Sequence, residues 1–275
     1  MTAYLRPRDL DEALAARAAH PDWMVLAGGT DLMVNANHGA PPAGILDLWR
    51  LAAVCFVRHA DGAIVIGAGT TWREVEREPV IRSQLAPLAA AAREIGALQI
   101  QSRATLGGNV GTSSPVGDSL PVLLALDATL EVASPRGRRT VAYRDWCTGY
   151  RTTQLAADEL IVAAHVPIPA PATRTAWRKV GTRRAQSISK VMGAAAILLD
   201  GDRVVEARIA LGAIADRPVR ISAAEAAVRG LRLTDAAAAA HAAVASAIRP
   251  IDDIRSTASY RREVAANLVA RFFAR

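Results

Sequence analysis

The stretch from Ala104 to Val132 reads ATLGGNVGTSSPVGDSLPVLLALDATLEV. It places two adjacent glycines and an asparagine after a short extended run, then small hydroxyl residues, and then an apolar helix. A shorter version of the pattern, VLAGGTDLMV, occurs from Val25 to Val34. Each stretch contains an apolar run, a Gly-Gly pair, a polar residue and an aspartate. The sequence therefore raises the question of whether both loops bind one ligand.

The glycine pairs point to an anionic ligand. A Gly-Gly pair after a strand lets the backbone adopt positive φ and approach a ligand closely. Successive N–H groups in such a turn form an anion-binding nest, and a helix that begins just afterwards adds partial positive charge. The two loops also hold side chains suited to phosphates, sugars or a ribityl chain: Thr30, Thr105, Asn109, Thr112, Asp31 and Asp118. This arrangement suits a dinucleotide cofactor.

The alternative is that both pairs are only tight turns, since Gly-Gly is common in turns. Neither loop matches GxGxxG or GxxxxGK[ST], so the Rossmann and P-loop fingerprints are absent.

The composition is that of a globular protein. The 275 residues are 51% hydrophobic and 4% aromatic, enough for one large or two modest domains. The formal net charge is +7, and only two of the 33 basic residues are lysines. Such a charge is typical of proteins that bind nucleic acid, an acidic partner or an anionic cofactor, and it also arises from a codon bias toward arginine.

Metal, membrane and export signals are not evident. Cys55 and Cys147 share no CxxC spacing, and the five histidines form neither HxxxH nor HExxH. We therefore expect no metal site in this chain, although one disulfide is possible. No run approaches the ~20 apolar residues of a membrane span. The opening residues lack the apolar segment of a secretory signal, so we expect a cytoplasmic protein without a membrane span.

The order of the expected elements indicates an α+β fold. The segment 54–69 predicts a hairpin that turns at Asp61–Gly62. Pro167, Pro169 and Pro171 cannot continue a central strand and predict a stiff connector. We place a domain boundary there, with a first domain at 1–170 (subdomains at about 1–55 and 56–170) and a second at 171–275. In the second, antiparallel strands are expected at 175–181, 192–202 and 203–214, and helices at 222–230, 234–248 and 259–275.

Several ordered motifs resemble the FAD-binding subunit of molybdenum hydroxylases, the medium subunit of the carbon monoxide dehydrogenase and xanthine dehydrogenase type. AGGTDLM at 27–33 is followed about 75 residues later by ATLGGNVGTSSPVGDSLPVLLALDA. YLRPRDLDEALA resembles the family's opening, and GYRTTQLAADELIVAAHVPIP the end of its FAD domain. WRKVGTRRAQSISKV and STASYRREVAANLV resemble its C-terminal domain, so the resemblance covers nearly the whole chain.

The resemblance implies a fold and a cofactor. The fold is a two-part FAD-binding domain of the vanillyl-alcohol-oxidase (PCMH) type, followed by a C-terminal α+β domain of antiparallel sheet plus helices. FAD is expected to be non-covalent, because neither loop holds the His or Cys through which covalent relatives attach flavin.

The implied FAD-binding residues fall into three groups. The two loops would grip the diphosphate, Thr112 and Asp118 would contact the flavin part, and Ile161 would line the pocket. Lys179 would lie near the flavin ring, the alternative being a solvated strand residue. The full set is Val25, Leu26, Ala27, Gly28, Gly29, Thr30, Asp31, Leu32, Thr105, Leu106, Gly107, Gly108, Asn109, Thr112, Asp118, Ile161 and Lys179.

The resemblance also implies partners. Substrate would be hydroxylated on a large molybdopterin subunit, and electrons would pass through [2Fe–2S] clusters of a small subunit to FAD here. FAD would pass them to an external acceptor such as NAD⁺ or a quinone, in a dimer of heterotrimers. This chain would need no catalytic acid–base or nucleophilic residue of its own, and none is evident.

Two departures from the family pattern refine this hypothesis. Ile95 stands where the animal xanthine dehydrogenases have an aromatic residue against the flavin, so a different flavin environment is expected, and NAD binding cannot be transferred from those enzymes. The chain has no cysteine-rich insertion, which excludes the extra cluster of the benzoyl-CoA branch.

Two other functions stay open at this point. One is a basic nucleic-acid-binding module, and the other is an FAD-free scaffold subunit of the same fold. The segment 173–190 is basic and contains no acid, so it is either a solvated edge or a surface for a partner subunit or an anionic electron acceptor. Its basic residues are Arg174, Arg178, Lys179, Arg183, Arg184 and Lys190.

Overall fold

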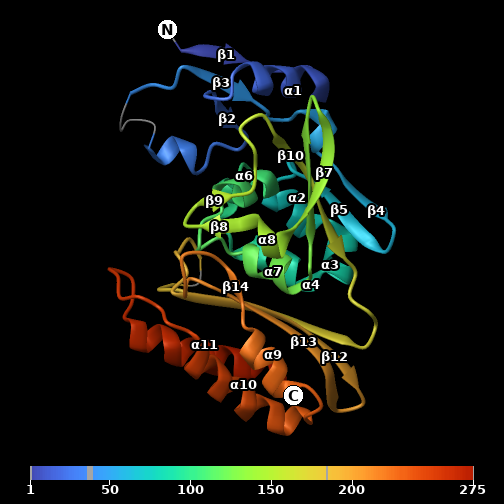
Figure 1. The fold of residues 1–275 in the computed structure, drawn as a ribbon, viewed down its shortest axis with the longest axis vertical. Helices are drawn as coiled ribbons and strands as arrows, with labels where there is room; N and C mark the ends of the chain where they lie inside the picture. Colours follow the sequence, from blue (N-terminus) through green and yellow to red (C-terminus); the bar gives the residue numbers. More distant parts are fainter. Residues whose placement is uncertain (1, 36–39, 184, 275) are drawn as a thin grey trace.

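A computed structural model describes residues 2–35, 40–183 and 185–274. The molecule is elongated, and its parts follow one another along the long axis in sequence order (Figure 1). The first part is a small parallel sheet in the order β1-β3-β2, beside one helix. Its elements are β1 (Ala3–Leu5), α1 (Leu10–Ala19), β2 (Met24–Leu26), η1 (Leu32–Asn35), β3 (Gly44–Asp47) and η2 (Ala52–Val54).

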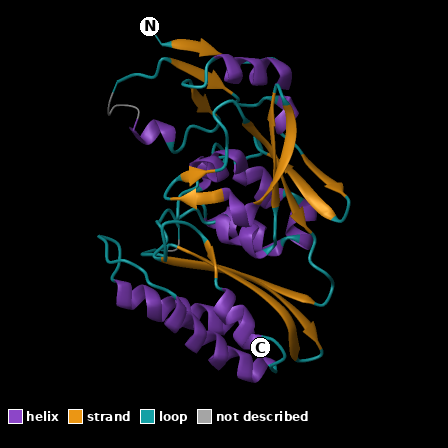
Figure 2. Ribbon diagram, viewed as in Figure 1, coloured by secondary structure: helices purple, strands orange, loops and turns teal. Residues whose placement is uncertain are grey.

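The middle part is an antiparallel sheet in the order β4-β5-β10-β6-β7, packed against short helices (Figure 2). Its strands are β4 (Val57–Ala60), β5 (Ala63–Gly67), β6 (Thr129–Ser134), β7 (Gly137–Ala142) and β10 (Leu160–Pro167), with a hairpin of β8 (Cys147–Gly149) and β9 (Thr152–Thr153). Its helices are α2 (Trp72–Arg77), α3 (Pro79–Gln84), α4 (Ala86–Glu94), α5 (Leu98–Gln101), α6 (Leu106–Thr112), α7 (Leu120–Ala125) and α8 (Tyr143–Trp146).

The last part is a second antiparallel sheet with helices on both faces. Helices α4 and α7 of the middle part contact one face, and the C-terminal helices contact the other (Figure 1). This shared sheet joins the two parts through a packed interface. Its elements are β11 (Thr173–Val180), β12 (Val191–Asp200), β13 (Arg203–Gly212), β14 (Val219–Arg220), α9 (Ser222–Val228), α10 (Leu233–Ala247) and α11 (Ala258–Phe273).

The local signals of the sequence account for much of this order. The hairpin β4–β5 turns at Asp61 and Gly62, which both have positive φ, as predicted. The connector after Pro167 contains no strand or helix up to Thr173. On α11, Leu268 and Phe272 are buried one turn apart, as the four-residue spacing predicts.

One local prediction is wrong. Gly107 and Gly108 do not form a turn with positive φ before a helix; they lie inside α6, which begins at Leu106. Thr105 caps this helix by accepting a hydrogen bond from the Gly108 N–H at 3.0 Å. Leu106 and Val110 are fully buried, so tertiary packing holds a helix that the glycines alone would disfavour.

Trp146 on α8 links this helix to the core. Its side chain is fully buried, and its Nε1 donates to the carbonyl of Val110 on α6 at 3.1 Å. We expect Trp146→Ala to lower the free energy of unfolding by about 3–5 kcal/mol, as a cavity at a large aromatic site does. Trp146→Phe should cost less, since a ring remains and only the hydrogen bond is lost. Urea unfolding checks both, and equal losses would contradict this account.

Candidate functional site

A cavity of about 490 Å³ opens where the first part of the fold meets the middle part. The loop after β2 forms one wall, α6 forms a second, and the start of β10 forms a third. Eleven of the residues expected at the cofactor line it: Val25, Ala27, Gly28, Gly29, Thr30, Asp31, Leu32, Gly107, Gly108, Thr112 and Ile161.

A second cavity of about 210 Å³ adjoins the first. The two share four lining residues: Thr30, Asp31, Gly108 and Thr112. Asn109 and Asp118 line the second cavity, and so does Ile95, the residue singled out above as replacing an aromatic. The shared residues make the two cavities neighbours, so one ligand long enough could occupy both.

Glycine is required where the backbone segments around the cavity touch. A Cβ added to Gly28 would overlap the carbonyl oxygen of Arg103. A Cβ added to Gly107 would lie 2.7 Å from the Cβ of Ala68 and 2.8 Å from its carbonyl oxygen. These glycines therefore let three segments, far apart in sequence, meet and enclose one space.

The first loop supplies unbonded amides. Gly29 has φ +77°, and among the described residues no acceptor lies in hydrogen-bond geometry with the N–H groups of Gly28, Gly29, Thr30 or Asp31. Successive free amides of this kind can form an anion-binding nest, so the nest expected in this loop stays a prediction that these amides allow.

The second loop does not supply them. The N–H groups of Leu106, Gly107 and Asn109 donate to the carbonyls of Thr70, Ala68 and Thr105, and that of Gly108 donates to the Thr105 hydroxyl. The prediction of a nest in this loop is therefore wrong. This second loop contributes bare backbone to the cavity wall, at Gly107 and Gly108.

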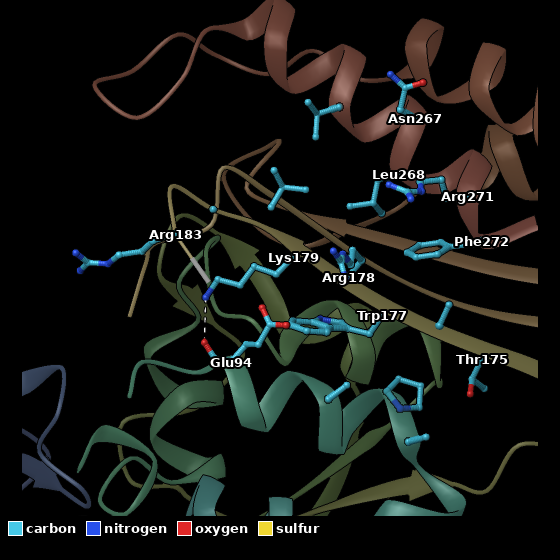
Figure 3. A pocket seen from close by; sticks show the side chains of 17 residues that line it. Glu94, Thr175, Trp177, Arg178, Lys179, Arg183, Asn267, Leu268, Arg271 and Phe272 are labelled. Carbon is cyan, nitrogen blue, oxygen red and sulfur yellow. Dashed lines mark hydrogen bonds between the residues drawn. The ribbon is translucent and has the colours of Figure 1, made fainter. Parts of the chain in front are cut away.

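A buried ion pair lies at the far end of the second cavity. Lys179 Nζ donates to Asp118 Oδ2 at 2.6 Å. It also donates to the Glu94 carbonyl at 3.2 Å (Figure 3). The Ser189 hydroxyl donates to the other Asp118 oxygen at 2.6 Å. Burial raises the pKa of the Asp118 carboxyl above its ordinary value, and the Lys179 ammonium partly offsets that rise.

Lys179 is therefore not a solvated strand residue, since its side chain is only 4% exposed. It lies on β11 of the C-terminal sheet and lines a separate groove, while Asp118 lines the second cavity. The ion pair is thus a wall between the cavity and the C-terminal part.

Three residues expected at the cofactor serve the fold instead. Leu106 is fully buried in the core, Thr105 caps α6, and Leu26 lies on β2 and lines neither cavity. Their neighbours in the same motifs form the cavity walls.

Other site residues were not predicted from the sequence. Arg151 pairs with Asp31 at 2.8 Å across the cavity mouth, and Ser189 orients Asp118. Gly69 lines the first cavity. The GAG run at 67–69 is a local sequence signal for Gly69, whereas Arg151 and Ser189 lie in motifs that carry the family resemblance but no local pattern marks either as a site residue.

The part of the chain that the structure describes contains no cluster of three or more His, Cys, Asp or Glu side chains placed to hold a metal ion. It also contains no helix of the length and apolarity that crossing a membrane requires. Cys55 and Cys147 are free thiols, so the disulfide left open above is not formed.

The basic residues of the segment 173–190 differ in burial. Lys179 is buried, Arg174 is half-buried, and Arg178 and Arg183 are exposed. Lys190 lies 5.2 Å from the ring centre of Tyr260. Arg184 lies outside the described residues.

Comparison with known families matches the chain almost end to end. Residues 1–169 match the FAD binding domain in molybdopterin dehydrogenase, and residues 176–275 match the CO dehydrogenase flavoprotein C-terminal domain. The chain is 32% identical over 273 residues to the glyceraldehyde dehydrogenase medium chain of Sulfolobus acidocaldarius, covering 98% of this chain and 96% of that one. It is 36% identical over 227 residues to the putative xanthine dehydrogenase FAD-binding subunit of Escherichia coli, covering 81% and 77%.

Solved structures give the same result. Carbon monoxide dehydrogenase from Hydrogenophaga pseudoflava superposes with a TM-score of 0.93 at 30% identity, covering 98% of this chain and 95% of that one. Quinoline 2-oxidoreductase from Pseudomonas putida superposes with a TM-score of 0.92 at 26% identity, covering 99% and 95%. The expected fold, an α+β FAD-binding part followed by an antiparallel sheet with helices, is confirmed.

The ion pair gives a testable prediction about stability. Lys179→Met leaves the Asp118 carboxylate buried without a counter-charge, so we expect it to lower the free energy of unfolding by about 3–5 kcal/mol at neutral pH. The double variant Lys179→Met/Asp118→Asn removes both charges and should recover most of that loss. Urea unfolding measures both.

The pH dependence of the single variant follows from the same charge. Without Lys179 the folded state holds the Asp118 proton more tightly than the unfolded state, so the stability deficit should shrink as the pH falls toward about 4. A deficit that is independent of pH would contradict a charged Asp118.

Proposed function

Because this chain belongs to the family of FAD-binding medium subunits of molybdenum hydroxylases, of the carbon monoxide dehydrogenase and xanthine dehydrogenase type, we propose that it holds FAD non-covalently in the two adjoining cavities and acts as the electron-transfer subunit. The chain is an oxidoreductase subunit. The observation that carries the proposed site is that residues of both glycine loops line the same two adjoining cavities.

The residues present fit this cofactor. The free amides of residues 28–31 suit a diphosphate, because they donate hydrogen bonds without adding a side chain to the space. Thr30 and Thr112 line both cavities and can donate further hydrogen bonds. Ile161 offers apolar surface in the first cavity. Ile95 offers apolar surface in the second cavity, where its side chain is suited to covering a planar ring.

Asp118 and Lys179 would set the charge at the flavin end. When bound, FAD supplies the redox chemistry, and the protein supplies binding, orientation and electrostatics. The Lys179 ammonium holds the Asp118 carboxylate in place, and Ser189 fixes its second oxygen. The Asp118 carboxylate at this end of the cavity therefore has a fixed orientation.

The finer assignments are part of the proposal. Electrons would enter from [2Fe–2S] clusters of a small partner subunit and leave to an external acceptor, NAD⁺ or quinone-like, while substrate would be hydroxylated on a large molybdopterin subunit. A dimer of heterotrimers is the proposed assembly. The two free thiols suit a reducing compartment, and we place the protein in the cytoplasm.

We also propose the division of the chain into a domain at 1–170, with subdomains at about 1–55 and 56–170, and a domain at 171–275. No observation among the described residues favours nucleic-acid binding, since many arginines are already paired with carboxylates, such as Arg139 with Glu159 and Arg220 with Glu225. The FAD-free scaffold is opposed by the open cavities.

Two glycine variants test the site. We expect Gly108→Leu to abolish FAD binding, because the side chain would extend from a residue that lines both cavities and has only Thr105 Oγ1 near its Cβ position, at 3.1 Å. The matched control Gly111→Ala adds one methyl at an ordinary 3.5 Å from Ile161 and should keep FAD. Flavin absorbance per chain measures both, with circular dichroism to confirm folding. A folded Gly108→Leu protein with one FAD per chain would place the cofactor elsewhere.

The mode of attachment is testable separately. The residues lining the two cavities include no histidine or cysteine, the side chains through which flavin is linked covalently in related folds. Acid precipitation of the yellow protein should therefore release all flavin to the supernatant. Colour that stays in the washed pellet would refute non-covalent binding.

A further inference from the structure

A groove of about 1040 Å³ lies on the far side of the Asp118–Lys179 pair from the cofactor cavities. It is bounded by α4 on one side and α11 on the other, with β11 between them (Figure 3). Consecutive residues of β11 line it, from Thr175 to Gly181. Successive strand residues point to opposite faces of a sheet, so a groove lined by all of them runs along the edge of the strand.

The edge of β11 is open along this groove. β11 is an outer strand of the sheet order β11-β12-β13-β14. The Leu199 N–H donates to the Ala172 carbonyl, and the register pairs Thr173 with Leu198 without a shift along β11. In an antiparallel ladder the residues whose backbone groups bond to the neighbouring strand alternate. Because Ala172 bonds to that strand, the N–H and C=O groups of the even-numbered residues of β11 point toward β12. Thr175, Trp177 and Lys179 therefore direct their backbone groups into the groove.

These backbone groups have no partner among the described residues. No hydrogen bond reaches the N–H or C=O of Thr175, Trp177 or Lys179, although the strand is half-buried along its length. An open edge of this kind is a template for a further strand, and proteins normally cover or blunt it. Polar backbone groups in a half-buried position favour a partner that completes the ladder.

The two walls of the groove differ in chemistry. The wall on the α11 side carries Arg178 and Arg271, which are exposed and pair with no carboxylate among the described residues. Arg183 lies just after the end of β11, and among the described residues its guanidinium donates to the carbonyls of Ala185 and Gln186 and to no carboxylate. The wall on the α4 side is small and apolar at Ala86, Pro87 and Ala90 and carries one acidic residue, Glu94, at the end of α4 next to Lys179.

We propose that an extended segment of a partner subunit, in which acidic residues alternate with small apolar residues, binds as an added strand along the edge of β11. Its backbone would bond to Thr175, Trp177 and Lys179, its acidic side chains would meet Arg178 and Arg271, and its apolar side chains would pack on α4. This inference rests on the proposed function, because it takes the occupant from the other subunits of the same enzyme.

The direct test is hydrogen–deuterium exchange resolved to single amides, on the full chain alone and in the co-purified assembly. We expect exchange at Thr175, Trp177 and Lys179 to slow at least roughly tenfold on assembly, because those amides become bonded only then. Ala176 and Arg178 serve as internal controls, since their amides already face β12 and should change little.

Charge-reversal variants test the choice of an acidic segment. Arg178→Glu and Arg271→Glu should each weaken the affinity of this chain for the rest of the assembly roughly tenfold, more at low salt than at high salt. The matched control Arg229→Glu makes the same charge change at an exposed position outside the groove and should leave the affinity unchanged.

The remaining outcomes count against the inference. An assembly that forms without slowing the three amides overturns it and leaves the proposed function standing. Slowing that appears in the isolated chain and grows with protein concentration assigns the edge to a second copy and also overturns it. If all three arginine variants weaken the affinity equally, the effect is one of general charge, and the proposal of an acidic segment is overturned. If the three subunits do not assemble at all, the proposed function fails, and this inference fails with it.

Discussion

The site depends on the close contact of three backbone segments, at residues 27–31, 68–69 and 103–108. Gly28 lies against the Arg103 carbonyl and Gly107 against Ala68, with no room for a side chain at either glycine. Arg103 strengthens the contact, since its Nε donates to the Gly28 carbonyl at 3.3 Å and its guanidinium stacks on Trp49. The first and middle parts of the fold are therefore held together at the point where the cofactor is proposed to bind. The loop makes this contact through the Gly28 carbonyl and the bare Cα of Gly28, and the N–H groups of residues 28–31 have no acceptor among the described residues.

The C-terminal part contributes to the same site without lining the first cavity. Its strand β11 delivers Lys179 to Asp118, its β11–β12 connection delivers Ser189, and Trp177 Nε1 donates to the Asp118 carbonyl at 3.0 Å. One short segment around Asp118 is thus held by three side chains from the C-terminal part of the fold. A buried ion pair contributes little net stability, but it fixes orientation, because a misplaced partner leaves an uncompensated charge. The geometry of the cavity end that Asp118 lines is consequently coupled to the packing of the C-terminal sheet on α4 and α7.

Local sequence signals predicted the parts of the structure that local chemistry decides. The Asp61–Gly62 hairpin, the proline connector and the apolar face of α11 all follow from turn preferences and side-chain periodicity. Helix α6 could not be predicted in this way, because two glycines disfavour a helix and only the burial of Leu106 and Val110 stabilises it. The Arg151–Asp31 and Ser189–Asp118 contacts join residues 120 and 71 positions apart, a distance over which no local pattern carries information. The ordered motifs identified the family, whereas the division of each motif into cavity-lining and fold-supporting residues required the structure.

The central claim is that the glycine loops enclose the FAD site, and a crystal structure of the chain grown with FAD tests it most directly. The account predicts the diphosphate within hydrogen-bond distance of the N–H groups of residues 28–31 and the flavin ring in the cavity lined by Ile95 and Asp118. Density for FAD in the groove along β11, or at any place away from the two glycine loops, would contradict the account.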